Sequence, residues 1–116
     1  LRKHGERFVT RCFSAAERAH IGKMPPDRQA AGYARRWAAK EACAKALGLG
    51  IRDDIFLKDI SIVNDAEGKP SLVLTGGAKE RLTALTPKGM TAQTHVSLSD
   101  DPPAAVAFVV ISAEKP

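Results

Sequence analysis

A glutamate and a lysine stand four residues apart in a stretch whose other side chains are mostly methyl groups. At about 100° per residue, Glu41 and Lys45 share one helical stripe with Ala34 and Ala38, and Trp37 lies at its edge. On a solvated helix this spacing makes an ion pair worth about 0.2–0.5 kcal/mol. If the alanine face packs closely on something, both charges are desolvated unless a ligand joins them. Glu41 would then offer an oxygen ligand to Mg²⁺, and Lys45 would hold a phosphate beside it.

A basic face near the N-terminus is the second candidate. Lys3, Arg7 and Arg11 follow at four-residue spacing, with Arg2 beside them and Phe8 as an apolar neighbour. Like charges so arranged destabilise a helix unless a partner opposes them. The face is therefore either solvated or a docking surface that attracts an acidic helix.

Two further segments carry groups suited to a phosphate or a nucleotide. His95, Ser97 and Ser99 alternate with apolar residues, so a strand presents all three on one face. His95 there is open to phosphate binding, to acid–base chemistry or simply to water. The turn-forming sequence DAEGKP ends in Lys69 and Pro70, which can offer a cation and backbone amides to a nucleotide.

Composition limits the class of protein. The chain has 116 residues, 44% hydrophobic and 27% charged, which is typical of one globular domain, and we expect residues 1–116 to form it. The net charge of +5 favours acidic or phosphorylated partners. Nucleic acid is not expected, because the four Phe, one Trp and one Tyr are not interleaved with Lys or Arg.

Several features of the sequence exclude other classes. No apolar run approaches the ~20 residues that a membrane helix needs, so no membrane partner is expected. Cys12 and Cys43 lack metal-ligand spacing and suit a reducing, cytoplasmic compartment. The sequence contains no Walker phosphate loop, no HExxH and no GxSxG.

Periodicity predicts the helices that must position these groups. The strongest covers residues 29–47, which are rich in alanine, lack proline and end before Gly48. A loop over residues 22–28 precedes it, with Asp27 as its cap. Residues 1–18 have helical spacing, although Ser14 and Glu17 fit a capping box that would start a second short helix.

Strand-like alternation predicts the remaining elements. They are a hairpin between residues 59–63 and 71–75, a helix over 78–85, and strands over 95–99 and 104–111. The last strand is apolar enough to be buried on both faces. This mixed order predicts an α+β fold, with an antiparallel sheet packed against the long alanine-rich helix.

The same residues resemble a known family. Residues 37–51, WAAKEACAKALGLGI, are similar to the signature helix of the bacterial holo-acyl-carrier-protein synthases, the small stand-alone class of 4′-phosphopantetheinyl transferase. Other stretches resemble further family segments in the same order: residues 5–17 the first helix with its FSAAE end, 59–60 and 68–70 the central hairpin, 95–99 and 104–111 the last two strands. The resemblance covers nearly the whole chain and implies the family's α+β fold.

The resemblance implies a reaction. The phosphopantetheine arm of coenzyme A moves to a serine of apo-acyl-carrier protein, with release of 3′,5′-ADP, in fatty-acid biosynthesis and lipid metabolism. Mg²⁺ is the implied cofactor, with Glu41 as its ligand and Lys45 on the reacting phosphates, both catalytic. Such a transfer needs a metal and cations that oppose developing charge, and either Glu41 or a water on the metal to accept the serine proton. The family form is a homotrimer with sites between neighbouring protomers.

The resemblance also assigns binding residues. In the family, the counterparts of Arg36 and His95 are associated with the 3′-phosphate of coenzyme A, and the turn at Lys69 and Pro70 borders the adenine. The implied coenzyme A site comprises Arg36, Lys45, Gly48, Lys69, Pro70, His95 and Ser97. The first helix docks the acidic carrier protein, which implies a second set: Arg2, Lys3, Arg7, Phe8 and Arg11.

Two departures from the family pattern matter. The opening strand, Gly-Ile-Gly-x-Asp-Ile, does not occur in the sequence, and its aspartate is the family's second metal ligand. We expect that strand to precede Leu1. Asp100 stands where many members have a second histidine, which alters the local phosphate contacts. A chain without the aspartate would suit an alternative function, a non-catalytic module that binds coenzyme A or a carrier protein.

Overall fold

The fold is that of a computed structural model, which describes residues 3–49, 57–101 and 104–116. Its elements follow in this order: α1 (Lys3–Cys12), α2 (Ala15–Gly22), α3 (Pro26–Ala46), β1 (Ile60–Asn64), β2 (Pro70–Leu74), α4 (Gly76–Leu85), β3 (Thr91–Asp101) and β4 (Ala104–Glu114). The predicted α+β class is confirmed. None of the described helices is both long enough and apolar enough to cross a bilayer.

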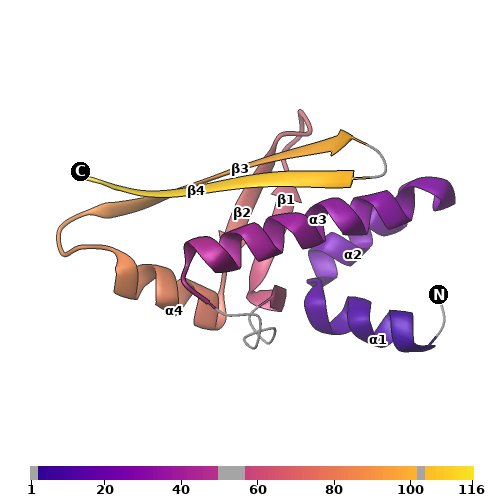
Figure 1. The fold of residues 1–116 in the computed structure, drawn as a ribbon, viewed down its shortest axis with the longest axis horizontal. Helices are drawn as coiled ribbons and strands as arrows, with labels where there is room; N and C mark the ends of the chain where they lie inside the picture. Colours follow the sequence, from indigo (N-terminus) through magenta and orange to yellow (C-terminus); the bar gives the residue numbers. More distant parts are fainter. Residues whose placement is uncertain (1–2, 50–56, 102–103) are drawn as a thin grey trace.

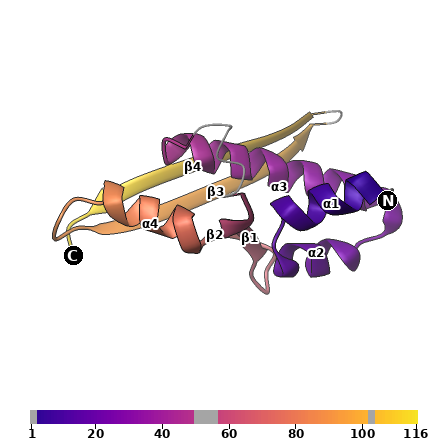
Figure 2. The same cartoon turned by 90° about the horizontal axis from the view of Figure 1, so that it is seen from below.

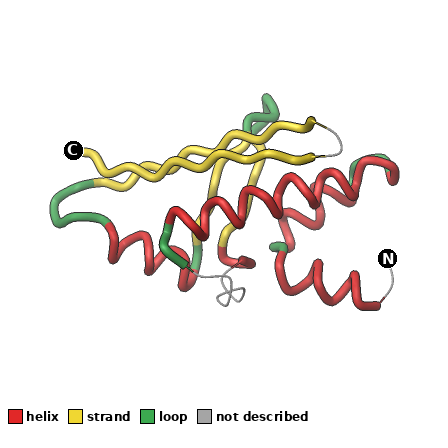
Figure 3. The backbone as a smooth tube through the Cα atoms, in the orientation of Figure 1, coloured by secondary structure: helices red, strands yellow, loops and turns green. Residues whose placement is uncertain are grey.

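Two antiparallel hairpins and one long helix form the body of the molecule. The β3–β4 ribbon lies along α3, and the β1–β2 hairpin crosses the ribbon (Figure 1). The same arrangement is clear when helices and strands are coloured apart (Figure 3). Seen from below, α4 lies at one end of the molecule and α1 with α2 at the other (Figure 2). The α3 helix is therefore the element that touches almost everything else.

The N-terminal region forms two helices rather than one continuous helix. Ser14 occupies the N-cap of α2, where its Oγ accepts from Glu17 N at 3.2 Å. Glu17 Oε1 in turn accepts from Ser14 N at 3.0 Å, which completes the capping box. Of the two alternatives that the sequence left open, the second short helix is correct, because the box satisfies amides that would otherwise lack partners.

The long helix begins earlier than predicted. It starts at Pro26 instead of residue 29, and the prediction of Asp27 as its cap is wrong. Pro25 stands at the N-cap without a side-chain hydrogen bond, and Pro26 follows in the first turn. Proline suits this position because it has no N–H to satisfy there. The predicted end holds, since α3 stops at Ala46 and Gly48 follows with φ +74°.

The first hairpin has the predicted antiparallel pairing, and the two last strands, which were predicted without a pairing, form a second antiparallel hairpin. In the first, the pairs run from Ile60 opposite Leu74 to Asn64 opposite Pro70. In the second, β3 and β4 are longer than predicted and pair from Thr91 opposite Glu114 to Asp101 opposite Ala104.

The prediction that the last strand is buried on both faces is wrong. Val106, Phe108 and Val110 on β4 are 39%, 69% and 58% exposed. The residues between them face α3, where Val109 and Ile111 pack against the core. A ribbon with one helical layer has only one covered face, so the apolar residues on the other face of β4 remain open within the described chain.

Two apolar clusters hold α3 in place. Cys43 and Leu47 from α3 pack with Ile60 from β1 and Ala78 from α4. The second cluster, at the α1 end, consists of Cys12, Phe13 and Leu57, with Val9, Tyr33 and Trp37 packed against it. Among the side chains of α3 that belong to neither cluster, Arg36 and Lys40 are buried, whereas Glu41 and Lys45 are more accessible.

Candidate active site

Glu41 and Lys45 lie on a part of α3 that the rest of the described chain leaves accessible. Glu41 is half-buried and Lys45 is exposed. Neither side chain makes a hydrogen bond or an ion pair with any residue of the described ranges. The simple Glu–Lys ion pair on a solvated helix is therefore not formed, and both charged groups are free to contact a ligand.

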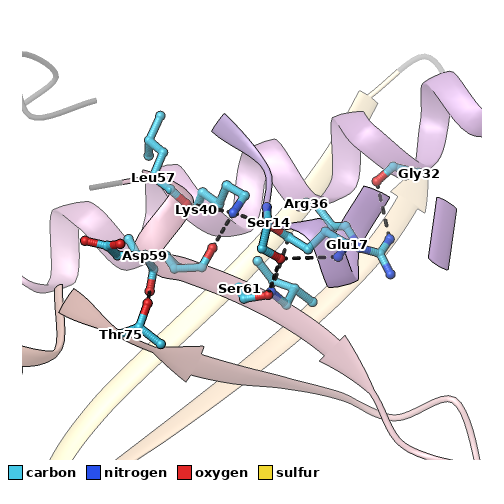
Figure 4. Close-up of polar contacts among 11 residues, drawn as sticks. Ser14, Glu17, Gly32, Arg36, Lys40, Leu57, Asp59, Ser61 and Thr75 are labelled. Atoms are coloured by element: carbon cyan, nitrogen blue, oxygen red, sulfur yellow. Dashed lines mark hydrogen bonds and ion pairs between the residues drawn. The ribbon is translucent and has the colours of Figure 1, made fainter. Parts of the chain in front are cut away.

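Lys40, the residue before Glu41, has the opposite environment. Its Nζ lies 2.6 Å from Glu17 Oε1, and both side chains are fully buried. It also donates to Leu57 O at 2.8 Å and to Ile60 O, so three acceptors surround it (Figure 4). Burial lowers the pKa of Lys40, while the Glu17 carboxylate opposes that shift. The ammonium thus joins α2 and α3 to the chain entering β1.

Glu17 completes this buried network. One carboxylate oxygen caps Ser14 N, and the other accepts from Ile62 N of β1 at 3.2 Å. Ser14 and Ser61 add a hydroxyl contact of 2.8 Å between the start of α2 and β1 (Figure 4). Every oxygen of the buried carboxylate is therefore satisfied, as a buried charge requires. We refer to Glu17 and Lys40 as the buried pair.

Arg36 lies one turn before Lys40 on the same side of α3. Its side chain is buried, with Nη2 donating to Asn64 Oδ1 at 2.7 Å and Nη1 donating to Gly32 O at 3.4 Å. No acceptor among the described residues faces its Nε. Burial lowers the pKa of Arg36, partly offset by the charge of Glu17. Its contacts in this structure are thus with the chain, and one buried donor remains without a partner.

A cavity of about 350 Å³ opens between α3, the β1–β2 turn and the end of β3. We call it the α3–turn cavity, and it is lined by Arg35, Asn64, Gly68, Pro70, Leu98 and Ser99. The turn is held by Asp65, whose Oδ1 accepts from Glu67 N at 2.9 Å and Lys69 N at 2.8 Å. Of the residues assigned to coenzyme A, Pro70 lines this cavity and exposed Lys69 adjoins it.

Within one chain, His95 and Ser97 lie apart from Glu41 and Lys45. Both are exposed on β3, opposite Val110 and Phe108 of β4 respectively. Strand alternation directs these residues away from α3, which packs on the other face of the ribbon. We call this open side the outer ribbon face; it consists of His95, Ser97, Ser99, Val106, Phe108 and Val110.

Gly48, also assigned to coenzyme A, is exposed just beyond the end of α3. Its φ of +74° suits glycine, and an added Cβ would lie 3.1 Å from Arg81 Nη2. Arg81 Nε donates to Leu47 O at 2.8 Å and so caps this helix end. A larger residue at position 48 would disturb the end of the helix that carries Lys45.

The basic face of α1 is present as far as the structure describes it. Arg7 and Arg11 are exposed, and Phe8 is 40% exposed. Arg2 lies outside the described residues, and of Lys3 only the helical backbone is described. The Phe8 ring lies 5.2 Å from that of Trp37, centroid to centroid. Between α1 and α3 an apolar cavity of about 390 Å³ is lined by Phe8, Val9, Phe13, Ala30, Tyr33, Ala34 and Trp37.

The donor set suits magnesium held in part by substrate. The described residues contain no group of three His, Cys, Asp or Glu that could enclose a metal ion. Glu41 supplies a partly accessible carboxylate on α3 that has no partner among the described residues. Mg²⁺ is commonly bound by one or two carboxylates together with substrate phosphates, so a single protein ligand on α3 fits this ion.

Sequence reasoning missed three residues of the site region. Lys40 was part of the recognised motif, but nothing in the spacing indicated that it would be buried against Glu17. Arg35 and Asn64 line the α3–turn cavity, although the sequence pattern had singled out neither of them. The capping box did identify Glu17 in the sequence, and its carboxylate was therefore a signal by which the buried pair could have been found.

Comparison with known proteins supports the family resemblance along nearly the full length of this chain. The model of the 4′-phosphopantetheinyl transferase superfamily matches residues 1–107. A holo-[acyl-carrier-protein] synthase of Rhodopseudomonas palustris (strain HaA2) is 54% identical over 113 residues, covering 96% of this chain and 80% of that protein.

Solved structures agree as well. An "ACPS-CoA complex" of Chronobacterium ammoniagenes has a TM-score of 0.82 at 26% identity, covering 99% of this chain and 87% of that one. A holo-(acyl-carrier-protein) synthase from Bacillus anthracis str. Ames, in complex with CoA (3′,5′-ADP), has a TM-score of 0.70 at 30% identity. The match covers 98% of this chain and 85% of that one. The resemblance found in the sequence is thereby confirmed: the chain belongs to the 4′-phosphopantetheinyl transferase superfamily, and within it to the bacterial holo-acyl-carrier-protein synthases.

Proposed function

We propose that this chain transfers the phosphopantetheine group from coenzyme A to a serine hydroxyl of an apo-acyl-carrier protein. In balanced form, the serine hydroxyl gives its proton to Glu41 or to a water, and its oxygen forms a bond to the β-phosphorus of coenzyme A. The bond from that phosphorus to the bridging oxygen breaks, and 3′,5′-ADP leaves with that oxygen. The observation that carries the proposal is that Glu41 and Lys45, one turn apart on α3, have no partner among the described residues, in a chain of this family. The coenzyme A complexes of two structural neighbours support the choice of donor.

The charges of this chain suit that chemistry. Lys45 is exposed and can oppose the negative charge on the reacting phosphates. Glu41 would hold Mg²⁺, which, when bound, neutralises phosphate oxygens and orients them for displacement. The holo-carrier product suits fatty-acid biosynthesis, and two buried cysteines that form no disulfide suit a reducing cytoplasm.

We further infer that the nucleotide end of coenzyme A occupies the α3–turn cavity. Pro70 forms part of its wall, Arg35 brings a cation, and Lys69 is exposed at its rim. The buried Arg36 Nε lacks an acceptor among the described residues, which supports a phosphate as its partner.

A complete site then needs a second copy of the chain. His95 and Ser97 lie on the outer ribbon face, whereas Glu41 and Lys45 project from α3 on the other side of β3. The apolar side chains of Val106, Phe108 and Val110 give that face a surface to bury. We propose a homotrimer in which the outer ribbon face of one protomer brings His95 and Ser97 to the α3 site of its neighbour.

The carrier protein is proposed to dock on α1. Exposed Arg7 and Arg11 provide positive charge for an acidic helix, and Phe8 beside them provides an apolar contact. Arg2 and Lys3 belong to the same proposed surface.

We further propose that residues 1–116 together form one catalytic domain.

Mass spectrometry of the carrier protein tests the reaction. The chain, expressed with any residues that its reading frame places before Leu1, is incubated with coenzyme A, Mg²⁺ and apo-acyl-carrier protein. We expect the carrier to gain the mass of one phosphopantetheine group while 3′,5′-ADP appears in equal amount. Tight binding of coenzyme A or carrier without any mass gain would instead establish the non-catalytic binding module.

A further inference from the structure

Asn64 lines the α3–turn cavity and connects the turn on one side of it with Arg36, a buried α3 residue next to the lining residue Arg35. We propose that Asn64 is a positioning residue for coenzyme A, holding the β1–β2 turn against Arg36 so that the nucleotide end meets both. This inference rests on the proposed function, because it names a role within that site.

The contacts of Asn64 run in two directions. Its Oδ1 accepts from Arg36 Nη2 at 2.7 Å, which is a short, charge-assisted hydrogen bond. Its Nδ2 donates to Gly68 O at 3.1 Å, in the turn itself. One amide therefore links α3 with the turn that carries Lys69 and Pro70.

The chemistry of both partners demands an amide at this position. The Arg36 guanidinium can only donate, and the Gly68 carbonyl can only accept. A side chain between them must offer an acceptor to one and a donor to the other. Aspartate would keep the acceptor but lose the donor, and alanine would lose both.

Asn64 provides the shorter of the two contacts that orient the Arg36 side chain. The other contact, from Nη1 to Gly32 O, is 3.4 Å long and lies within α3. Without Asn64 the buried guanidinium would retain one long hydrogen bond and gain freedom to turn. The direction of Nε, which has no acceptor among the described residues and is the donor proposed for a phosphate, would then no longer be fixed.

The turn does not need Asn64 in order to form. Asp65 already holds it through the amides of Glu67 and Lys69, and Gly68 has the φ of +86° that its bend requires. The side-chain amide of Asn64 therefore positions the turn relative to α3 and is not needed for the turn to fold. Loss of the amide should let an intact turn move relative to α3 and widen the cavity that both of them line.

Steady-state kinetics with varied coenzyme A, at saturating apo-carrier protein, provides the test. We expect Asn64→Ala to raise the KM for coenzyme A about tenfold, as the loss of a hydrogen bond to a charged group would. We expect kcat to stay within about twofold, since no reacting atom is touched. The dissociation constant of 3′,5′-ADP, measured by calorimetry, should rise by a similar factor.

Two further variants separate positioning from folding. Asn64→Asp keeps the contact to Arg36 and should still raise the KM for coenzyme A, because it cannot donate to Gly68 O. Ser71→Ala, at an exposed β2 position outside the cavity, should change neither constant. A merely structural loss would lower kcat through the active fraction and leave KM unchanged, and that result would overturn the role of Asn64.

The outcomes for the unaltered chain keep the two proposals apart. If it transfers the group and binds 3′,5′-ADP while both Asn64 variants match it in KM and affinity, only the positioning role is overturned. If the unaltered chain neither transfers the group nor binds 3′,5′-ADP, the proposed function falls, and the role of Asn64 falls with it.

Discussion

Lys40 and Glu41 are neighbours in the sequence but belong to different parts of the molecule. The Lys40 ammonium is fully buried, bound to Glu17 and to two carbonyl oxygens. The Glu41 carboxylate, about 100° further round the helix, is half-buried and has no partner among the described residues. The helix thus turns one charged residue into the fold and leaves the next partly accessible.

This contrast separates two uses of charge within one motif. A buried charge is tolerated only when it is paired and fully hydrogen-bonded, and the buried pair meets that condition. A charge that is to bind a metal or a phosphate must keep its bonding capacity unused, and Glu41 and Lys45 make no bond to any described residue. Stability and activity should therefore respond to different substitutions.

The largest effect should come from breaking the buried pair. Lys40→Met leaves the Glu17 carboxylate buried without its cation, which costs about 3–5 kcal/mol of unfolding free energy. The thermal unfolding midpoint should therefore fall by more than about 10 °C, measured by circular dichroism.

The double variant Glu17→Gln/Lys40→Met serves as the control. It buries no unpaired charge, so it should be more stable than Lys40→Met alone. If Lys40→Met kept the original unfolding midpoint, the division between a structural and a functional charge would be wrong.

The matching change on the open side is Glu41→Gln. It keeps the size of the side chain but removes the charge that would hold Mg²⁺, and we expect kcat/KM to fall about a hundredfold or more, some 2.7 kcal/mol. The unfolding midpoint should stay within about 2 °C, because no described contact is lost. Full activity of this variant at limiting Mg²⁺ would exclude the metal role of Glu41.

The outer ribbon face gives a second contrast, between an apolar surface and the polar residues beside it. Phe108→Lys places a charge at the most exposed apolar position of β4. We expect light scattering coupled to size exclusion to show the mass of one chain for this variant and of three for the original. Transfer activity should fall with assembly, because His95 and Ser97 would no longer reach a neighbouring α3.

Leu85→Lys is the matched control for that experiment. Leu85 is 45% exposed on α4, away from the ribbon, and should tolerate the lysine without loss of assembly or activity. A monomeric original chain with full activity would contradict the shared site.

A smaller effect is expected at the proposed carrier surface. Charge reversal in Arg7→Glu/Arg11→Glu should raise the KM for the carrier protein about tenfold at low salt and less at high salt, since exposed charges act through screened attraction. The KM for coenzyme A should not change. Lys79→Glu/Lys88→Glu, two exposed reversals on α4 and in the loop after it, change the net charge by the same amount. An equal effect there would show that total charge, not the α1 face, governs docking.

Much of this division could be predicted from the sequence, but not all. The spacing placed Glu41 and Lys45 correctly on one face because helical periodicity is local. The capping box identified Ser14 and Glu17 for the same reason. The burial of Lys40 could not be predicted, because its partners lie on α2 and on the chain entering β1, and only tertiary packing brings them together.

The role of Asn64 was not predicted, and β4 was wrongly predicted to be buried on both faces. These two failures have a related cause. Asn64 read as ordinary turn chemistry, since its bond to Arg36 spans 28 positions in the sequence. An apolar strand indicates that something covers it, but not whether the cover is the same chain or a neighbour. The exposed Phe108 shows that the described chain does not provide that cover.

The smallest effect concerns Cys43, which lies on the covered side of α3, one turn from Lys40. Burial raises the pKa of this thiol from its usual 9.0 to about 11. Because the folded pKa is the higher one, the thiol's contribution to stability is complete below about pH 9 and is lost as the pH rises through 11. The free energy of unfolding, from urea titrations between pH 8 and 11, should therefore fall less in Cys43→Ala than in the original chain. Lys40 and the other groups that titrate in this range are present in both chains, so the difference reports the thiol together with its coupling to Lys40. Equal slopes would mean that Cys43 is not shielded from water, and that the covered side of α3 is more open than its packing indicates.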